Sequence, residues 1–126
     1  MSDIKEVAST RAPEAVGPYS QAIIVDNLVF TSGSLPIDPA TKTMPGDIRE
    51  QAKQSLENLR VILEEAGTGF GKVVKATVYL ADIKDFQAVN EVYASFFSKP
   101  CPARSCFAVA ALPLGARVEI ELVAAK

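Results

Sequence analysis

The side chains that could carry out chemistry in this chain are those of Arg, Lys, Asp, Glu, Tyr, Ser, Asn and Cys, because the sequence contains no histidine. Without histidine the chain cannot build a Ser-His-Asp or Cys-His catalytic site or a His-ligated metal site. The two cysteines, Cys101 and Cys106, are too few for a structural zinc site, which normally needs four Cys or His ligands. Any reaction must therefore depend on charge, on positioning and on carboxylate acid–base chemistry.

Arg104 and Cys106 lie two residues apart in a segment predicted to be a strand, so their side chains project from the same face. An arginine on a sheet face either forms a salt bridge, here with Glu119 or Glu121, or binds an anion. As an anion site it would clamp a substrate carboxylate, because a guanidinium matches a carboxylate with two parallel hydrogen bonds. Cys106 is most simply a small buried apolar residue, and no histidine is present to activate it as a nucleophile.

Glu119 and Glu121 also share one face of a predicted strand. They are either solvated or, inside a subunit interface, desolvated so that the pKa rises toward a range useful for acid–base catalysis. Asn90 shares a helical stripe with Phe86 and Tyr93, at spacings of four and three residues. Because a buried amide needs partners, Asn90 either ties its helix to a loop or contacts a ligand.

Tyr19 and Ser32 are weaker candidates, each beside a turn or glycine. Gly33, directly after Ser32, could let the backbone approach a ligand closely. The glycine-rich segment 67–71 lacks the Lys-Ser/Thr that follows a phosphate-binding loop, and it opens a strand rather than a helix, so it is predicted to be a turn.

The elements that position these residues follow from hydrophobic periodicity. Asp47 and Glu50 form a capping-box-like pair before an apolar helical stripe, and Gly67 is placed to end that helix. Residues 8–20 are predicted to be an arm without regular structure, and the last two strands to form a pair. The pattern predicts strands at 23–25, 28–32, 73–80, 104–110 and 117–124 and helices at 48–66 and 84–97.

This order of elements predicts an α+β sandwich in which two helices cover one face of a single mixed β-sheet. The other face would be uncovered, and a bare sheet face with apolar content usually finds a partner surface. We therefore expect a closed homo-oligomer that packs through this face. Strand alternation places the following residues on it: Thr77, Tyr79, Arg104, Cys106, Glu119 and Glu121.

Length and charge limit the classes of partner. The 126 residues are expected to form a single domain, residues 1–126, and the net charge is −2 without a basic stripe, which argues against nucleic-acid binding. No apolar run approaches the ~20 residues needed to span a bilayer. The first seven residues contain no apolar signal core, so we expect a cytoplasmic protein with free thiols and no membrane partner.

Six segments occur in an order that resembles the RidA family, also called YjgF, of enamine/imine deaminases. The resemblance extends from about residue 8 to the C-terminus, and the combination of the Gly-Pro-Tyr, Thr-Ser-Gly and Pro-Ala-Arg-Ser-Cys sequences is specific, whereas each alone is not. The six segments span residues 17–22, 30–33, 51–58, 89–93, 102–106 and 118–121.

The resemblance implies a chorismate-mutase-like α+β fold and a homotrimer whose clefts lie between subunits. It also implies a 2-iminobutanoate/2-iminopropanoate deaminase that hydrolyses 2-aminoacrylate and 2-iminobutanoate to 2-keto acids and ammonia, with neither a metal nor an organic cofactor. Its small-molecule partner would be a 2-imino or 2-keto acid. The uncovered sheet face, argued from strand alternation alone, agrees with such an assembly.

Carried over position by position, the resemblance makes Arg104 the carboxylate-binding arginine and Glu119 the glutamate that holds the attacking water. The backbone of Cys106 would contact the ligand, and Tyr19, Ser32 and Asn90 would line the cleft. The chain departs from the family pattern at Ser34, where many members have Gln, and in a short loop before Pro102. Both departures bear on substrate preference rather than on the core chemistry.

Three other functions remain open at this point. The trimer could bind a small carboxylate and regulate a partner, which an assay of ammonia release would distinguish from a deaminase. It could be an endoribonuclease or translation inhibitor, as some relatives are labelled, although the charge and the missing histidine argue against this. It could also be a structural or chaperone-like trimer, in which case replacing Arg104 would affect no small-molecule assay.

Overall fold

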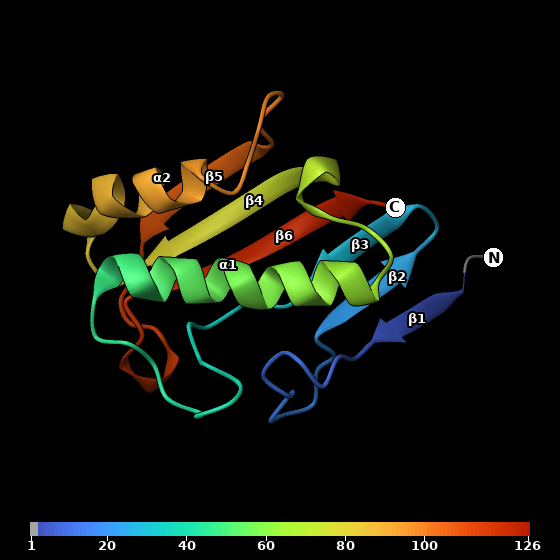
Figure 1. Ribbon diagram of the computed structural model, residues 1–126, viewed down its shortest axis with the longest axis horizontal. Helices are drawn as coiled ribbons and strands as arrows, with labels where there is room; N and C mark the ends of the chain where they lie inside the picture. Colours follow the sequence, from blue (N-terminus) through green and yellow to red (C-terminus); the bar gives the residue numbers. More distant parts are fainter. Residues whose placement is uncertain (1–2) are drawn as a thin grey trace.

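The computed structural model describes residues 3–126 as one mixed six-stranded sheet with both helices packed on the same side (Figure 1). This confirms the predicted α+β architecture. The strand order is β1-β2-β3-β6-β4-β5, and all neighbours are antiparallel except β4 and β5, which are parallel. The helices and strands are α1 (Ile48–Glu65), α2 (Phe86–Ala94), β1 (Ile4–Val7), β2 (Ala22–Val25), β3 (Leu28–Thr31), β4 (Val73–Leu80), β5 (Ala103–Ala108) and β6 (Val118–Ala125).

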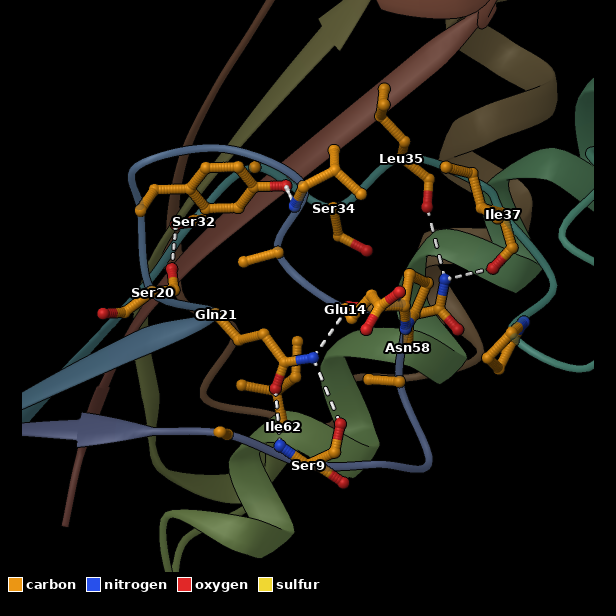
Figure 2. A pocket seen from close by; sticks show the side chains of 18 of the residues that line it. Ser9, Glu14, Ser20, Gln21, Ser32, Ser34, Leu35, Ile37, Asn58 and Ile62 are labelled. Carbon is orange, nitrogen blue, oxygen red and sulfur yellow. Dashed lines mark hydrogen bonds between the residues drawn. The ribbon is translucent and has the colours of Figure 1, made fainter.

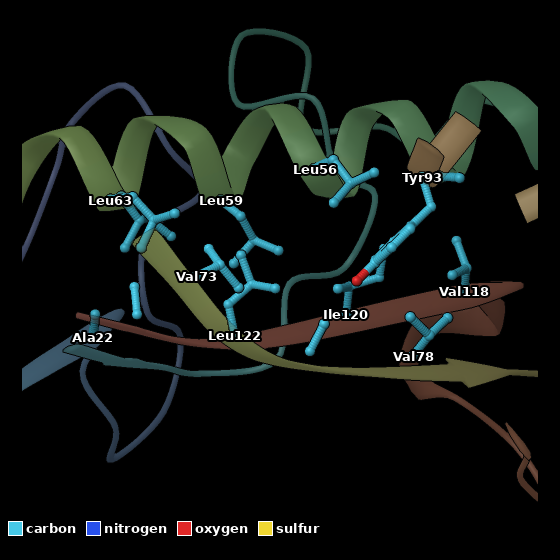
Figure 3. Close-up of a cluster of buried hydrophobic side chains, with 14 of the residues drawn as sticks. Ala22, Leu56, Leu59, Leu63, Val73, Val78, Tyr93, Val118, Ile120 and Leu122 are labelled. Atoms are coloured by element: carbon cyan, nitrogen blue, oxygen red, sulfur yellow. The ribbon is translucent and has the colours of Figure 1, made fainter. Parts of the chain in front are cut away.

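Helix α1 begins and ends where the sequence predicts. The Asp47 carboxylate accepts a hydrogen bond from the Glu50 amide, 3.1 Å away, which satisfies one free N–H of the first turn. Gly67 takes a φ of +85° just past the helix end, a conformation that favours glycine. The apolar stripe of α1 packs against β6 and β4 in a fully buried core (Figure 3), which includes Leu56, Leu59, Leu63, Val78, Ile120 and Leu122.

Three predictions about the elements need correction, and strand β4 carries an irregularity. Strand β1 was not expected, and it pairs with β2 as an edge strand. Strands β5 and β6 do not pair with each other, because β4 lies between them. Helix α2 is shorter than predicted: it ends at Ala94, and a 3₁₀ turn over Ile83–Asp85 precedes it. A bulge between Val73 and Lys75 turns Val74 away from the core face.

The segment between β1 and β2 has no regular structure, as predicted. It folds back on the body as an arm (residues 8–20), which Gln21 holds. The Gln21 side-chain amide donates to the carbonyls of Ser9 and Pro13 at 3.2 and 2.7 Å, and its oxygen accepts from the Ser9 amide. Across residues 3–126 no helix is long and apolar enough to cross a membrane.

Candidate active site

Arg104 and Cys106 lie on the helix-covered side of the sheet, not on the uncovered face predicted from alternation. The parallel register places Arg104 beside Ala76 and Cys106 beside Val78, and both β4 residues are fully buried under the helices. Paired residues of neighbouring strands point to the same face. The prediction failed because every residue of the edge strand β5 is at least partly exposed, so burial of its own residues does not reveal which face is inward.

Arg104 is held by helix α2. Its Nη1 donates a hydrogen bond to Oδ1 of Asn90, with 2.7 Å between the two atoms. This contact brings together two residues that the sequence singled out separately. The expected salt bridge to Glu119 or Glu121 is not formed, and within residues 3–126 no carboxylate lies within ion-pair distance of Arg104. The guanidinium therefore carries a positive charge that this part of the chain leaves without a counter-charge.

Two aromatic rings that sequence reasoning assigned to the core also contact Arg104. Its Cζ lies 4.9 Å from the centroid of the Tyr93 ring and 5.6 Å from that of Phe86. Phe86, Asn90 and Tyr93 repeat at helical spacing, so α2 presents all three to the same guanidinium. The sequence shows the helical spacing of these three residues, but it does not show that β5 lies beside α2.

Cys106 is a half-buried free thiol. Burial raises its pKa, and the positive charge of Arg104 only partly opposes this effect. The thiol therefore stays protonated at neutral pH, and a protonated thiol is a poor nucleophile. This agrees with the sequence argument against covalent catalysis.

Glu119 lies on the uncovered face, as predicted, because its neighbours Val118 and Ile120 point into the core. Its carboxylate packs against the backbone of Gly33, so closely that a Cβ built on Gly33 would collide with it. The glycine thus makes room for a side chain of the protein, rather than for a ligand as the sequence suggested. Burial raises the pKa of Glu119, and the nearby charge of Glu121 raises it further.

The Tyr79 hydroxyl donates a hydrogen bond to Glu121 on the same face. This bond, together with burial, raises the pKa of Tyr79 to about 12. The Tyr79 ring also meets Phe107 edge to face, with 5.4 Å between centroids. Tyr79 therefore remains a neutral hydrogen-bond donor at physiological pH and fixes the orientation of Glu121.

Tyr19 and Ser32 lie beside Gly33 at the edge of a cavity of about 770 Å³ between the arm, the loop after β3 and helix α1. Figure 2 shows Ser32 hydrogen bonded to the Ser20 carbonyl, at 2.6 Å, and Asn58 of α1 bonded to two carbonyls of the loop. The side-chain amides in the cavity wall thus already donate hydrogen bonds to backbone carbonyls. Tyr19 is half-exposed, and its hydroxyl accepts from the Val16 amide at 3.5 Å.

The predicted site residues therefore form two groups within one chain. The Arg104 group consists of Arg104, Asn90 and Cys106 on the helix side of β5. The Glu119 group consists of Glu119 on the uncovered face and of Ser32 and Tyr19, which line the cavity together with Gly33. Strand β4 separates β5 from β6, and the side chains of Arg104 and Glu119 point to opposite faces. A single chain does not bring both groups to one small molecule.

Within residues 3–126 no group of three or more His, Cys, Asp or Glu residues is arranged to hold a metal ion.

Comparison with known proteins identifies the family. Residues 9–126 match the family model described as endoribonuclease L-PSP. A goat (Capra hircus) protein named 2-iminobutanoate/2-iminopropanoate deaminase is 53% identical over 119 residues, which cover 94% of this chain and 87% of the relative. The chain belongs to the endoribonuclease L-PSP family. This confirms the RidA (YjgF) resemblance noted in the sequence.

Solved structures of RidA-family proteins share the fold over nearly the whole chain. RidA from the Antarctic bacterium Psychrobacter sp. PAMC 21119 has a TM-score of 0.94 and 43% identity, covering 97% of this chain and 99% of that one. TdcF of E. coli, solved with bound serine, has a TM-score of 0.93 and 42% identity, covering 97% and 98%. At 42–43% identity the likeness supports membership of the same family as well as a shared fold.

Proposed function

We propose that this protein hydrolyses reactive 2-imino acids and their enamine tautomers, such as 2-iminobutanoate and 2-aminoacrylate, to 2-keto acids and ammonia. The observation that carries the proposal is the Arg104 guanidinium, which is half-buried and held by Asn90 while no carboxylate of residues 3–126 neutralises it. Such a group favours a small carboxylate ligand. The names of the relatives at about 50% identity support the imine as the reacting group.

The reaction needs few catalytic groups. Water adds to the imine carbon, a proton moves to the nitrogen, and the tetrahedral adduct collapses to the keto acid as ammonia leaves. Arg104 would fix the substrate carboxylate, while Glu119 would hold the water and transfer a proton. A carboxyl whose pKa is raised toward neutrality is better matched to that role than an ordinary exposed glutamate. Tyr19, Ser32, Asn90 and the backbone of Cys106 would line the cleft.

The same proposal assigns the two groups to different copies of the chain in a homotrimer. The uncovered face supports this assembly, since it exposes several large apolar side chains: Leu28 at 38%, Phe30 at 41% and Phe107 at 44%. A head-to-tail ring of three copies would use this face and place Arg104 of one copy near Glu119 of the next. Free Cys101 and Cys106 suit the reducing cytoplasm expected from the sequence.

A coupled assay tests the activity. A pyridoxal-phosphate-dependent threonine dehydratase generates 2-iminobutanoate, and the formation of 2-ketobutanoate is followed with and without this protein. We expect the protein to accelerate keto-acid formation, and expect Arg104→Ala to lose the acceleration. Equal rates with and without the wild-type protein would contradict the proposal. Cleavage of single-stranded RNA at physiological salt would instead favour the ribonuclease that the family description names.

A further inference from the structure

The aromatic rings around Arg104 have no role in the proposed function so far. Both ring centroids lie within about 6 Å of the guanidinium, the range in which a cation is attracted to the face of a ring. A salt bridge could also hold the arginine, but it would cancel the charge that a substrate carboxylate requires. Rings orient the guanidinium and leave its net charge in place.

The hydrogen bonding of Arg104 shows which edge is free. Its one side-chain hydrogen bond within residues 3–126 uses Nη1, toward Asn90. A guanidinium has five N–H donors, so the edge formed by Nε and Nη2 remains unpaired in this part of the chain. That edge has the geometry for two parallel hydrogen bonds to a carboxylate.

Tyr93 contributes its ring rather than its hydroxyl. The residue is 93% buried, and its hydroxyl is a buried oxygen without a hydrogen-bond partner in residues 3–126. Figure 3 shows Tyr93 extending from α2 toward the sheet, near Ile120, so the hydroxyl lies among apolar side chains. A hydroxyl placed there does not contribute to holding a ligand at the far edge of Arg104.

We infer that Phe86 and Tyr93 are positioning residues that hold the Arg104 guanidinium with its Nε–Nη2 edge open to the substrate carboxylate. This inference rests on the proposed function, since it assumes that Arg104 binds that carboxylate. According to this inference, the rings of Phe86 and Tyr93 contribute to substrate affinity. It also predicts that the hydroxyl of Tyr93 is dispensable.

The test compares ring-removing and ring-keeping variants in two measurements, the KM for 2-iminobutanoate and the Kd of the stable product 2-ketobutanoate by calorimetry. We expect Phe86→Leu to raise both constants about threefold and Tyr93→Leu about tenfold, with kcat changed less than KM. Tyr93→Phe keeps the ring and should match the wild-type protein. Phe86 is 38% exposed, so Phe86→Leu tests the inference even if Tyr93→Leu does not fold.

A matched control comes from another arginine on an aromatic ring. Arg60 lies 5.4 Å from the centroid of the Phe96 ring, and both residues lie outside the two candidate groups. Phe96→Leu should leave KM and Kd unchanged, whereas a merely structural role of the rings would lower unfolding midpoints without weakening the affinity of the folded protein.

The outcomes separate this inference from the function on which it rests. If Arg104→Ala binds 2-ketobutanoate as tightly as the wild-type protein, the proposed role of Arg104 fails. If Arg104→Ala loses binding while folded Phe86→Leu and Tyr93→Leu keep wild-type constants, only the positioning role fails. Loss of affinity in Tyr93→Phe would also overturn it, since the hydroxyl would then be required.

Discussion

Around Arg104 the protein surrounds a permanent positive charge with two rings and an amide, whereas around Glu119 it packs a carboxylate against bare glycine backbone. The first arrangement leaves the positive charge of Arg104 without a counter-charge in residues 3–126. The second arrangement raises the pKa of Glu119 through burial and through the charge of Glu121, so this carboxyl can exchange a proton more readily.

Under the proposed function, this contrast separates substrate binding, at Arg104, from proton transfer, at Glu119. The Arg104 group lacks an anion, and the Glu119 group lacks a cation, so neither is neutralised by its own surroundings within residues 3–126. In a 2-imino acid the reacting carbon carries both a carboxylate and a basic nitrogen. Such a molecule, held where two copies of the chain meet, would satisfy both groups.

Replacing Arg104, the proposed substrate-binding residue, should have the largest effect on activity. Arg104→Ala is expected to lower kcat/KM for 2-iminobutanoate by about a thousandfold, because two charge-assisted hydrogen bonds are lost. The coupled keto-acid assay measures this loss. Arg60→Ala is the matched control, since Arg60 also packs on a ring but is exposed and lies outside the two candidate groups, and the activity of this variant should be unchanged. If Arg60→Ala lost as much activity as Arg104→Ala, the loss could not be assigned to substrate binding by Arg104.

Replacing Glu119, the proposed proton-transfer residue, should affect turnover rather than substrate affinity. Glu119→Gln is expected to lower kcat by about a hundredfold, with KM changed little, because general acid–base catalysis typically contributes that order of effect. Steady-state kinetics over a range of substrate supply distinguishes the two constants. Glu121→Gln, on the same face, should retain most of kcat. A Glu119→Gln variant with wild-type kcat would move the proton-transfer role to another residue.

A smaller effect is expected from displacing Glu119 without replacing it. In Gly33→Ala the new methyl group collides with the carboxylate, so Glu119 must shift. We expect kcat to fall by about tenfold, since misplacing a catalytic group is costly. Gly46→Ala is the control, because a Cβ at Gly46 meets nothing within 4 Å. If Gly33→Ala keeps wild-type kcat, the position of Glu119 does not control turnover.

The smallest effect is on stability. The pKa of Glu119 is raised above 4.5 in the folded protein, so the folded state binds this proton more tightly than the unfolded chain does. The stabilisation from protonation is complete below pH 4.5 and is lost as the pH rises through the raised pKa. Glu119→Gln does not ionise there, so its unfolding midpoint at pH 7 should be about 2 °C above that of the wild-type protein.

Thermal unfolding at several pH values measures this difference. It should shrink on acidification and vanish below pH 4.5, where the wild-type carboxyl is neutral in both states. A constant difference at every pH would point to packing rather than to the ionisation of Glu119.

The sequence predicts the parts of this molecule that local patterns determine. Asp47, the leucine stripe of α1 and Gly67 define a helix without reference to the rest of the chain, and the alternation of β6 places Glu119 correctly on the uncovered face. These features depend on neighbours within a few residues. Both helices and five of the six strands of residues 3–126 follow from such signals, and only β1 does not.

The orientation of Arg104 depends instead on a distant partner. Strand β5 pairs in parallel with β4, across a helix, and its residues show no contrast between buried and exposed positions. The sequence therefore identified Arg104 and Asn90 separately but not their contact. In the same way Gly33 was recognised as a close-approach position, while the Glu119 carboxylate that approaches it comes from a strand at the other end of the chain.

The proposed site requires that a substrate be held by Arg104 of one copy and processed by Glu119 of another. Co-expression of Arg104→Ala and Glu119→Gln subunits, each expected to lose about a hundredfold or more of its activity alone, tests it directly. In mixed rings assembled at random from equal amounts, about a quarter of the sites combine an intact Arg104 with an intact Glu119. We predict recovery of about a quarter of the wild-type activity. A mixture no more active than its parents would contradict the account.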